Sequence, residues 1–296
     1  MTDILISVPA YPDLGKDVNV SRVKMVLGGS AANFGVAITK LGLFSGMIGK
    51  VCDDWFGKFA LAELQRGGID ISQVMVEKGT DSGIVTSIVD GMGERTMFSY
   101  RGVNTRLEPS EIDPNYIRKA TLLHISGYGL VKSPQREAVL KCARLAKESG
   151  VLTSFDPGPL IHLAESSAVS QILGLTDVFL PNYDEMRCLP EGDVEPLLNA
   201  GPKIIGVKMG NRGCLVAQGD KRIRMPAFKV NVMDTTGAGD AWGAGFMAAL
   251  LREPANLERA SKFANAAAAI AIGKEGAIAS LPSEHEVNCF LANQDI

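Results

Sequence analysis

The stretch that decides the fold runs Asp234-Thr235-Thr236-Gly237-Ala238-Gly239-Asp240 and leads directly into an apolar helical segment, Ala241 to Leu250. Three small residues stand at the first turn of that helix, where unpaired backbone N–H groups and the positive end of the helix dipole attract anions. Asp240 lies at the same end and could be a helix-capping carboxylate. Capping leaves Gly237, Ala238 and Gly239 unexplained, whereas a phosphate group needs such close access to the backbone. We therefore predict a phosphoryl-transfer site in which these N–H groups stabilise the moving phosphoryl group and Asp240 is the general base.

The composition indicates a large α/β protein. The chain has 296 residues, of which 46% are hydrophobic, and a formal net charge of −3. This acidic balance argues against a nucleic-acid partner, because nucleic-acid-binding domains usually carry a basic surface. The alanine-rich stretch from Ala264 to Ile272 is too short to span a bilayer, and no secretion signal opens the chain. We expect a cytoplasmic enzyme with no membrane partner.

The cysteines and histidines show no pattern of a disulfide framework or a zinc site. The five cysteines form no CxxC pair and lie far apart in the sequence. The histidines lack metal-ligand spacing, and we interpret all three as structural: His124, His162 and His285.

Short apolar strands alternate with amphipathic helical segments, which is typical of a mostly parallel sheet covered on both faces. The expected strands are Gly46–Val51, Thr121–Ile125, Val151–Phe155, Asp177–Leu180 and Ile204–Val207. The expected helices are Phe56–Arg66, Pro134–Ser149, Ala241–Leu251 and Leu257–Ile272.

A second group of strands alternates apolar with polar residues and predicts a small antiparallel sheet projecting from the main body. These strands are Ile4–Val8, Val18–Val26, Gly83–Asp90 and Arg95–Arg101. Gly91-Met92-Gly93 joins the last two as a hairpin turn.

Another glycine cluster, Gly28-Gly29-Ser30-Ala31-Ala32-Asn33, precedes an apolar segment that ends at Gly42. Ser30 and Gly42 could simply cap the two ends of a helix. The paired glycines and Asn33 would also suit a small hydroxylated ligand at the helix start. Neither glycine cluster has the spacing of a P-loop or of a dinucleotide fingerprint, which disfavours a dehydrogenase.

With both clusters in view, the chain resembles the ribokinase-like, phosphofructokinase-B-type family of carbohydrate and nucleoside kinases over nearly its whole length. The resemblance implies an α/β fold with a mostly parallel central sheet flanked by helices and a small antiparallel β lid. Residues 1–296 would form one kinase domain, with lid strands from about 4–27 and 81–102. It also implies ATP as the phosphoryl donor, Asp240 as the catalytic base, and Gly237, Ala238 and Gly239 as the anion hole. Gly28, Gly29 and Asn33 match the positions that bind the substrate.

The same resemblance implies the nucleotide and metal sites. Asn182 and Glu185 match an Asn-x-x-Glu element that organises Mg²⁺ and the phosphates through water, although on spacing alone they could be an ordinary helix start. The positions implied to bind the nucleotide are Lys208, Gly210, Gly213 and Asn265, the last beside the adenine. A monovalent cation such as K⁺ would use carbonyls near Asp234 and Thr236 and in the segment from Ile272 through Glu275 to Ala277.

Three further residues are candidates for substrate binding. Arg101 ends the second lid hairpin, and Asp156 ends a core strand on the side where ligands bind in open α/β sheets. No Arg follows Asp156, which argues against a sugar acid as substrate. Asp3 matches the carboxylate that grips sugar hydroxyls, and the strand that usually precedes it is expected to be absent, leaving its place in the sheet empty or filled by another segment.

The leading functional hypothesis is a kinase for a neutral sugar of the ribose or fructose type. The alternative is a purine-nucleoside kinase, with a base slot formed by Met97, Phe98, Tyr100 and Tyr128. A non-catalytic small-molecule sensor is disfavoured because the base and the anion hole are both intact. We also expect a homodimer formed through the lid, since the lid has an apolar face with no helix to cover it.

Overall fold

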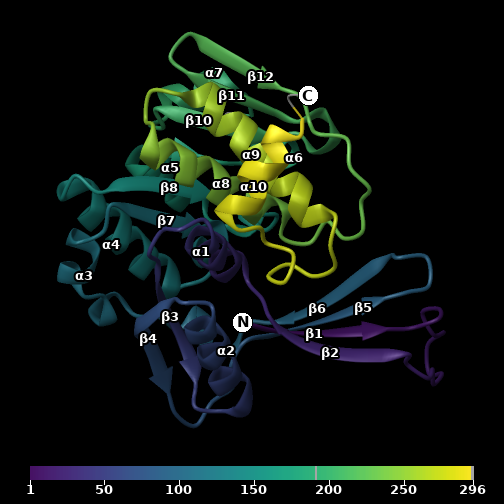
Figure 1. Cartoon of the computed structure of the whole chain (residues 1–296). Coiled ribbons are helices and arrows are strands. Elements are labelled where there is room, and N and C mark those ends of the chain that lie inside the picture. Colours follow the sequence, from purple (N-terminus) through teal and green to yellow (C-terminus); the bar gives the residue numbers. More distant parts are fainter. Residues whose placement is uncertain (191, 295–296) are drawn as a thin grey trace.

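The computed structural model describes residues 1–190 and 192–294 and shows a layered α/β body with a projecting β-sheet (Figure 1). The main sheet has six strands in the order β12-β11-β10-β9-β8-β7. Strands β7 to β10 are parallel, and β11 and β12 extend the sheet as an antiparallel hairpin. The strands are β7 (Leu122–Ser126), β8 (Leu152–Asp156), β9 (Val178–Phe179), β10 (Ile204–Lys208), β11 (Cys214–Gln218) and β12 (Lys221–Met225).

Both faces of the main sheet are buried, because side chains alternate along each strand. Val178 and Ile204 belong to the core beneath α8 and α9, whereas the adjacent Phe179 and Ile205 belong to the core beneath α4 and α5. The helices are α1 (Ser30–Lys40), α2 (Trp55–Arg66), α3 (Pro114–Arg118), α4 (Gln135–Glu148), α5 (Ser166–Leu175), α6 (Tyr183–Arg187), α7 (Val194–Asn199), α8 (Ala238–Arg252), α9 (Leu257–Ile272) and α10 (Glu284–Ala292). No helix in the described ranges is both long and apolar enough to cross a membrane.

The two central helices pack tightly because Gly245 lets their backbones approach. A Cβ added at Gly245 would lie 3.0 Å from the Ala267 Cβ and 3.1 Å from the Ala264 Cα. This contact between α8 and α9 fixes the direction of α8, whose first turn carries the predicted phosphoryl-transfer residues.

The projecting sheet is the predicted lid, in the order β2-β1-β5-β6 (Figure 1). Its strands are β1 (Thr2–Ser7), β2 (Arg22–Leu27), β5 (Ile84–Val89) and β6 (Arg95–Tyr100). The antiparallel pairing is confirmed within both hairpins, and the central pair, β1 with β5, is parallel. Strand β2 begins at Arg22 rather than at Val18, because residues 18–21 form no ladder with β1.

The predicted core strands and helices are confirmed, with boundaries shifted by at most three residues. The parallel strands, however, form two sheets: β3 (Gly46–Cys52) and β4 (Asp70–Glu77) pair only with each other among the described strands. Strands β3 and β7 therefore each keep one edge to which a further strand could bond. Strands β4, β11 and β12 were not predicted.

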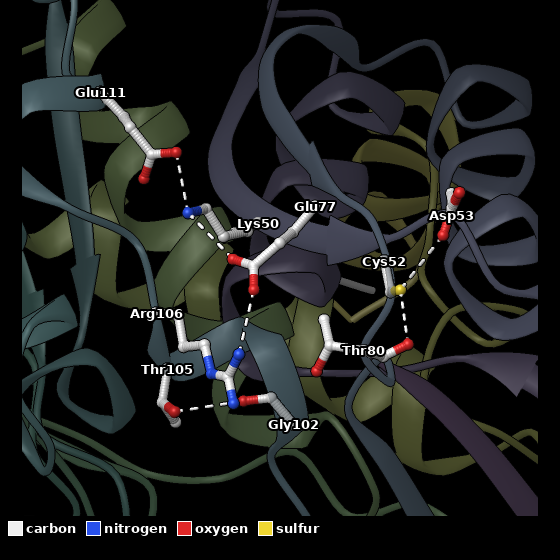
Figure 2. A network of polar contacts seen from close by, with 9 residues as sticks. All are labelled: Lys50, Cys52, Asp53, Glu77, Thr80, Gly102, Thr105, Arg106 and Glu111. Atoms are coloured by element: carbon white, nitrogen blue, oxygen red, sulfur yellow. Dashed lines mark hydrogen bonds and ion pairs between the residues drawn. The ribbon is translucent and has the colours of Figure 1, made fainter.

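A buried charge network joins the two-stranded sheet to the chain that follows the lid (Figure 2). Lys50, only 7% exposed, lies 2.8 Å from Glu111 Oε1 and 3.4 Å from Glu77 Oε2. Arg106 donates to the other oxygen of Glu77 at 3.0 Å. Because a buried ammonium without partners is strongly unfavourable, Lys50 holds these two carboxylates in place. The network fixes the 3-10 helix Gly102–Thr105 (η1) just after β6.

Candidate active site

The first turn of α8 is an exposed set of backbone donors on a rigid helix. Gly237 precedes the helix with φ +75°, and a Cβ there would lie 3.0 Å from the Ala277 Cβ, so both conformation and space favour glycine. In the described part of the chain, the N–H groups of Gly239 and Asp240 have no acceptor. Asp240 does not cap the helix, so the capping interpretation is wrong. The helix start is therefore open to an anion.

Asp240 is held by two side chains from the start of α1. Ser30 donates its hydroxyl to Oδ1, and Asn33 donates its amide to Oδ2, each at 2.8 Å. Burial, with repulsion from Asp156, raises the pKa of Asp240 to about 6. A carboxylate with that pKa is ionised at neutral pH and still basic enough to accept a proton. Ser30 was missed as a site residue, because its expected role as a helix cap is wrong: it makes no cap hydrogen bond.

Two buried acceptor atoms of the predicted substrate-binding residues have no partner within the described residues. They are Asn33 Oδ1 and Asp3 Oδ1. The Asp3 carboxylate lies flat against Gly28, where an added Cβ would come within 2.1 to 2.3 Å of its atoms. Burial raises the pKa of Asp3 despite the nearby amino terminus and Arg101. Buried acceptors of this kind need hydroxyl or amide donors, which a hydroxylated ligand would supply.

A lysine–aspartate pair lies beside the helix start. Lys208 Nζ lies 2.6 Å from Asp156 Oδ2, and both side chains are largely buried. A Cβ added at Gly239 would lie 3.5 Å from Lys208 Nζ, which places the ammonium next to the free N–H groups of α8. Burial lowers the pKa of Lys208, but Asp156 and Glu185 outweigh it and the pKa rises overall. Lys208 is therefore a permanent positive charge at this site.

Asn182 and Glu185 form the start of α6. The Asn182 side chain accepts from the Glu185 N–H at 2.7 Å, and Glu185 Oε2 accepts from the Asn182 N–H at 2.8 Å. The ordinary helix-start interpretation is thus confirmed as a capping box. Burial raises the pKa of Glu185; the charge of Lys208 lowers this pKa and that of Asp156 raises it. Within the described residues, Glu185 Oε1 and the N–H groups of the Asn182 side chain have no hydrogen-bond partner.

The remaining nucleotide candidates form the loop between β10 and β11 and its support. Gly213 has φ +84°, and a Cβ there would lie 2.0 Å from the Met225 carbonyl oxygen, so this turn requires glycine. Gly210 has φ +58° with open space around it. Asn265 is buried: its amide donates to the carbonyls of Met225 and Pro226 and accepts from Trp242 Nε1. These bonds show that Asn265 supports the loop at Pro226, and its expected position beside the adenine stays a prediction.

The segments expected to bind a monovalent cation lie side by side. The Asp234 carboxylate accepts from the N–H and hydroxyl of Thr236 and from the Gly276 N–H. The Ile272 carbonyl accepts from the N–H groups of Met233 and Asp234. Glu275 points to Arg22 of the lid, and Ala277 packs against Gly237. These bonds connect the anion-hole loop to the end of α9, and the described residues include no cluster of three acidic, cysteine or histidine side chains.

The lid lies over this site. Arg95 donates to the Thr236 hydroxyl, and Arg22 lies 3.1 Å from Glu275. Arg101 lies over the Tyr128 ring, with its Cζ 4.4 Å from the centroid. Burial raises the pKa of Tyr128, and Asp240 and Glu185 contribute to the shift, so Tyr128 faces the same cluster.

The histidines and cysteines stay outside this chemistry. His124 Nδ1 lies 2.8 Å from Ser154 Oγ, its ring stacks on Phe34, and burial lowers its pKa to about 4. All five cysteines are free.

The Asp240 carboxylate, an open helix N-terminus, a lysine and a β lid lie together, as the phosphoryl-transfer hypothesis predicts. Comparison with known proteins agrees: a family model described as pfkB family carbohydrate kinase matches residues 3–284. The chain belongs to this family of carbohydrate kinases.

Solved structures confirm the ribokinase-like fold. Ribokinase from Thermotoga maritima superimposes with a TM-score of 0.87 at 26% identity, covering 99% of this chain and 96% of that one. A fructokinase from Xylella fastidiosa shares the fold, with a TM-score of 0.88 at 20% identity, covering 100% of this chain and 97% of that one.

Sequence relatives are named as sugar kinases. An ATP-dependent ribose-1-phosphate kinase from Halopiger xanaduensis is 32% identical, over 99% of this chain and 95% of its own. Fructokinase-1 from Oryza sativa subsp. japonica is 32% identical, over 88% of this chain and 86% of its own.

Proposed function

We propose that the protein transfers the γ-phosphoryl group of ATP to a primary hydroxyl of a small sugar of the ribose or fructose type, with Asp240 as general base. The observation that carries the proposal is the position of a carboxylate, held by Ser30 and Asn33 and with a pKa of about 6, at an open helix N-terminus that the lid contacts. The names of the relatives support sugars as the acceptor class. A non-catalytic sensor would have no need of a base held in this way.

Each group then has one role. Asp240 accepts the hydroxyl proton while the free N–H groups of Gly239 and Asp240, in the turn formed with Gly237 and Ala238, bind the transferred phosphoryl oxygens. Lys208 neutralises charge beside the same helix start. Asp3, Asn33, Gly28 and Gly29 orient the acceptor, and lid closure excludes water, which suppresses hydrolysis of ATP.

Two metal ions belong to the proposal. Asn182 and Glu185 would hold Mg²⁺ through water, and Mg²⁺ would neutralise the phosphate oxygens when bound. Their side-chain atoms that have no partner within the described residues fit that role. A monovalent cation such as K⁺ would bind carbonyls of the loop joined by Asp234 and Ile272, and activation by KCl over LiCl would test this.

Sugar is favoured over nucleoside because the lid aromatics face outward. Phe98 and Tyr100 of β6 are aligned, through their partners on β5, with Ile4 and Thr2 of β1. Their side chains therefore lie on the face of the lid opposite Asp3. They cannot line the base slot that the nucleoside hypothesis requires, which leaves only Met97, in the row of Leu5, and Tyr128 on the side of the site.

The outer lid face supports a homodimer. It carries a continuous apolar row, and α2 reaches only its base, where Thr2 donates to the Phe56 carbonyl. Val23 and Phe98 remain 60% and 54% exposed. A second copy of the same face would cover these side chains. The five free cysteines fit a reducing compartment, so we place the enzyme in the cytoplasm.

The test is ADP release from MgATP with ribose, fructose, adenosine and inosine in turn. The proposal expects release that depends on a sugar and is at least tenfold slower with nucleosides. Release with nucleosides only would overturn the choice of acceptor, and release without any acceptor would overturn transfer itself.

A further inference from the structure

Arg95 lies on the face of the lid that turns toward the body. Its partner across the hairpin is Val89 of β5, and Val89 pairs in turn with Ser7 of β1. Side chains alternate along a strand, so Ser7 shares the face of Asp3 and Arg95 shares it too. From this face the Arg95 side chain donates to the hydroxyl of Thr236. Thr236 is the last residue before the glycine turn that starts α8, so the lid brings a guanidinium group to the anion hole.

Positive charges lie at both ends of this turn. Lys208 Nζ lies at the Gly239 end, 3.5 Å from the position of an added Cβ, and is paired with Asp156 at 2.6 Å. Arg95 lies at the Thr236 end and forms no ion pair with a carboxylate of the described residues. A hydroxyl oxygen carries no charge to match that of a guanidinium group. The other N–H groups of the Arg95 side chain have no acceptor in the described ranges, so they remain available to an anion.

Thr236 is itself fixed, and it therefore holds the guanidinium group in place. Its hydroxyl donates to Asp234 Oδ1 at 2.6 Å and accepts from Arg95 with an oxygen lone pair. The other carboxylate oxygen of Asp234 accepts from the Gly276 N–H at 2.9 Å. The contact point of Arg95 thus belongs to the loop that carries the anion hole, and the direction of its side chain is set by that loop.

The charge of Arg95 acts on both sides of the site. Burial raises the pKa of Asp3, and Arg95 is one of the positive charges that lower it. Burial also raises the pKa of Asp234, but hydrogen bonds from Thr236 and Gly276, together with the charge of Arg95, hold that pKa below its usual range. Arg95 is therefore within electrostatic reach of the proposed acceptor site at Asp3 and of the anion-hole loop at Asp234. A phosphoryl group in transfer has to pass between these two places.

We propose that Arg95 is a catalytic residue of the lid, which binds the γ-phosphoryl oxygens of ATP during transfer. This inference rests on the proposed kinase function and adds a residue to its mechanism. The acceptor oxygen forms a bond to the γ-phosphorus, the bond from that phosphorus to the bridging oxygen breaks, ADP leaves with the electron pair, and the hydroxyl proton passes to Asp240. Arg95 forms no covalent bond: its N–H groups stabilise the oxygens on which negative charge develops. Transfer is then fastest when the lid lies against the body.

Steady-state kinetics of Arg95→Gln and Arg95→Lys, with MgATP and the sugar that the wild type phosphorylates fastest, provide the first measurement. Arg95→Gln should lower kcat by about 10²- to 10³-fold and leave the KM values for ATP and sugar within about threefold, as expected for an interaction made in the transition state. Arg95→Lys should recover about tenfold of this loss, because it keeps the charge without the planar fork. Arg22→Gln is the matched control: it removes a different contact between lid and body, the exposed ion pair with Glu275, and should change kcat by less than about threefold.

A transition-state mimic provides a second measurement, which a purely structural role would not change. Calorimetry compares the binding of MgADP alone with that of MgADP, aluminium fluoride and the sugar together, because the fluoride complex imitates the phosphoryl group in transfer. Arg95→Gln should weaken binding of the fluoride complex by about 10²-fold and leave the Kd of MgADP within about threefold.

Three results would overturn the inference. Equal losses of kcat in Arg22→Gln and Arg95→Gln would make Arg95 a lid contact only. Equal weakening of MgADP and of the fluoride complex would assign Arg95 to nucleotide binding, and an unchanged kcat in Arg95→Gln would remove it from the reaction.

The proposed function fails separately, if the wild type forms no acceptor-dependent ADP with any sugar. If Arg95→Gln does not fold, Arg95→Lys decides the question. A fluoride complex weakened at least about tenfold in Arg95→Lys, with MgADP unchanged, supports the inference, and equal binding of both to variant and wild type overturns it.

Discussion

Replacing Asp240 with asparagine should abolish transfer while preserving the fold and ATP binding. The oxygen of the new amide can keep the hydrogen bond from Ser30, and Asn33 can flip its own amide to present the oxygen that has no partner in the native structure. The helix N–H groups are unchanged. Only the proton acceptor is lost, and a lost general base costs about 10²- to 10⁴-fold in rate, or about 2.7–5.4 kcal/mol of barrier.

The same substitution should not destabilise the protein. Burial raises the pKa of Asp240 from 3.8 to about 6, so the folded state favours the protonated form. The ionised carboxylate therefore lowers the free energy of unfolding by roughly 3 kcal/mol above pH 6, and this effect is absent below pH 3.8. The amide of Asp240→Asn carries no charge, so the Tm of the variant at pH 7.5 should equal or exceed that of the wild type. ADP release, ATP titration calorimetry and thermal unfolding measure the three quantities. Retention of more than a tenth of wild-type turnover in a folded variant would mean that another group is the base.

Three further predictions follow from the site and the lid. The kcat/KM of the wild type should fall tenfold per pH unit below about 6, because Asp240 must be ionised, and a profile flat down to pH 5 would contradict that role. Gly28→Ala should displace Asp3 and lower kcat/KM for the acceptor by about 10²-fold, with the KM for ATP unchanged. The control Gly49→Ala, at a position with open space around it, should behave as wild type, and equal effects of the two substitutions would refute the packing argument. The wild type should sediment as a dimer at micromolar concentration and Phe98→Glu as a monomer, so a monomeric wild type would remove the lid interface.

The sequence predicted the parts of the site that short segments encode. The Gly237 to Asp240 turn and the apolar helix after it lie together in the chain, so the proposed base and anion hole were visible as one motif. The parallel body strands were visible as apolar runs for the same reason.

Contacts between distant segments were not visible. Ser30 bonds Asp240 across 210 residues, and nothing in its local sequence distinguishes that role from a helix cap. The Asn265 amide donates to the carbonyls of Met225 and Pro226, about 40 residues earlier in the chain. Alternation along β6 placed Phe98 and Tyr100 on one face, but only the structure shows that Arg95, on the other face, is turned inward.

The most direct test of the kinase assignment is to measure ADP formation and the ³¹P NMR spectrum in one reaction with MgATP and each sugar of the panel. We predict one new phosphate ester, coupled to the protons of a primary carbon, for each ADP formed, and none without an acceptor. ADP formed without a new ester, or an ester at a secondary hydroxyl, would contradict the assignment.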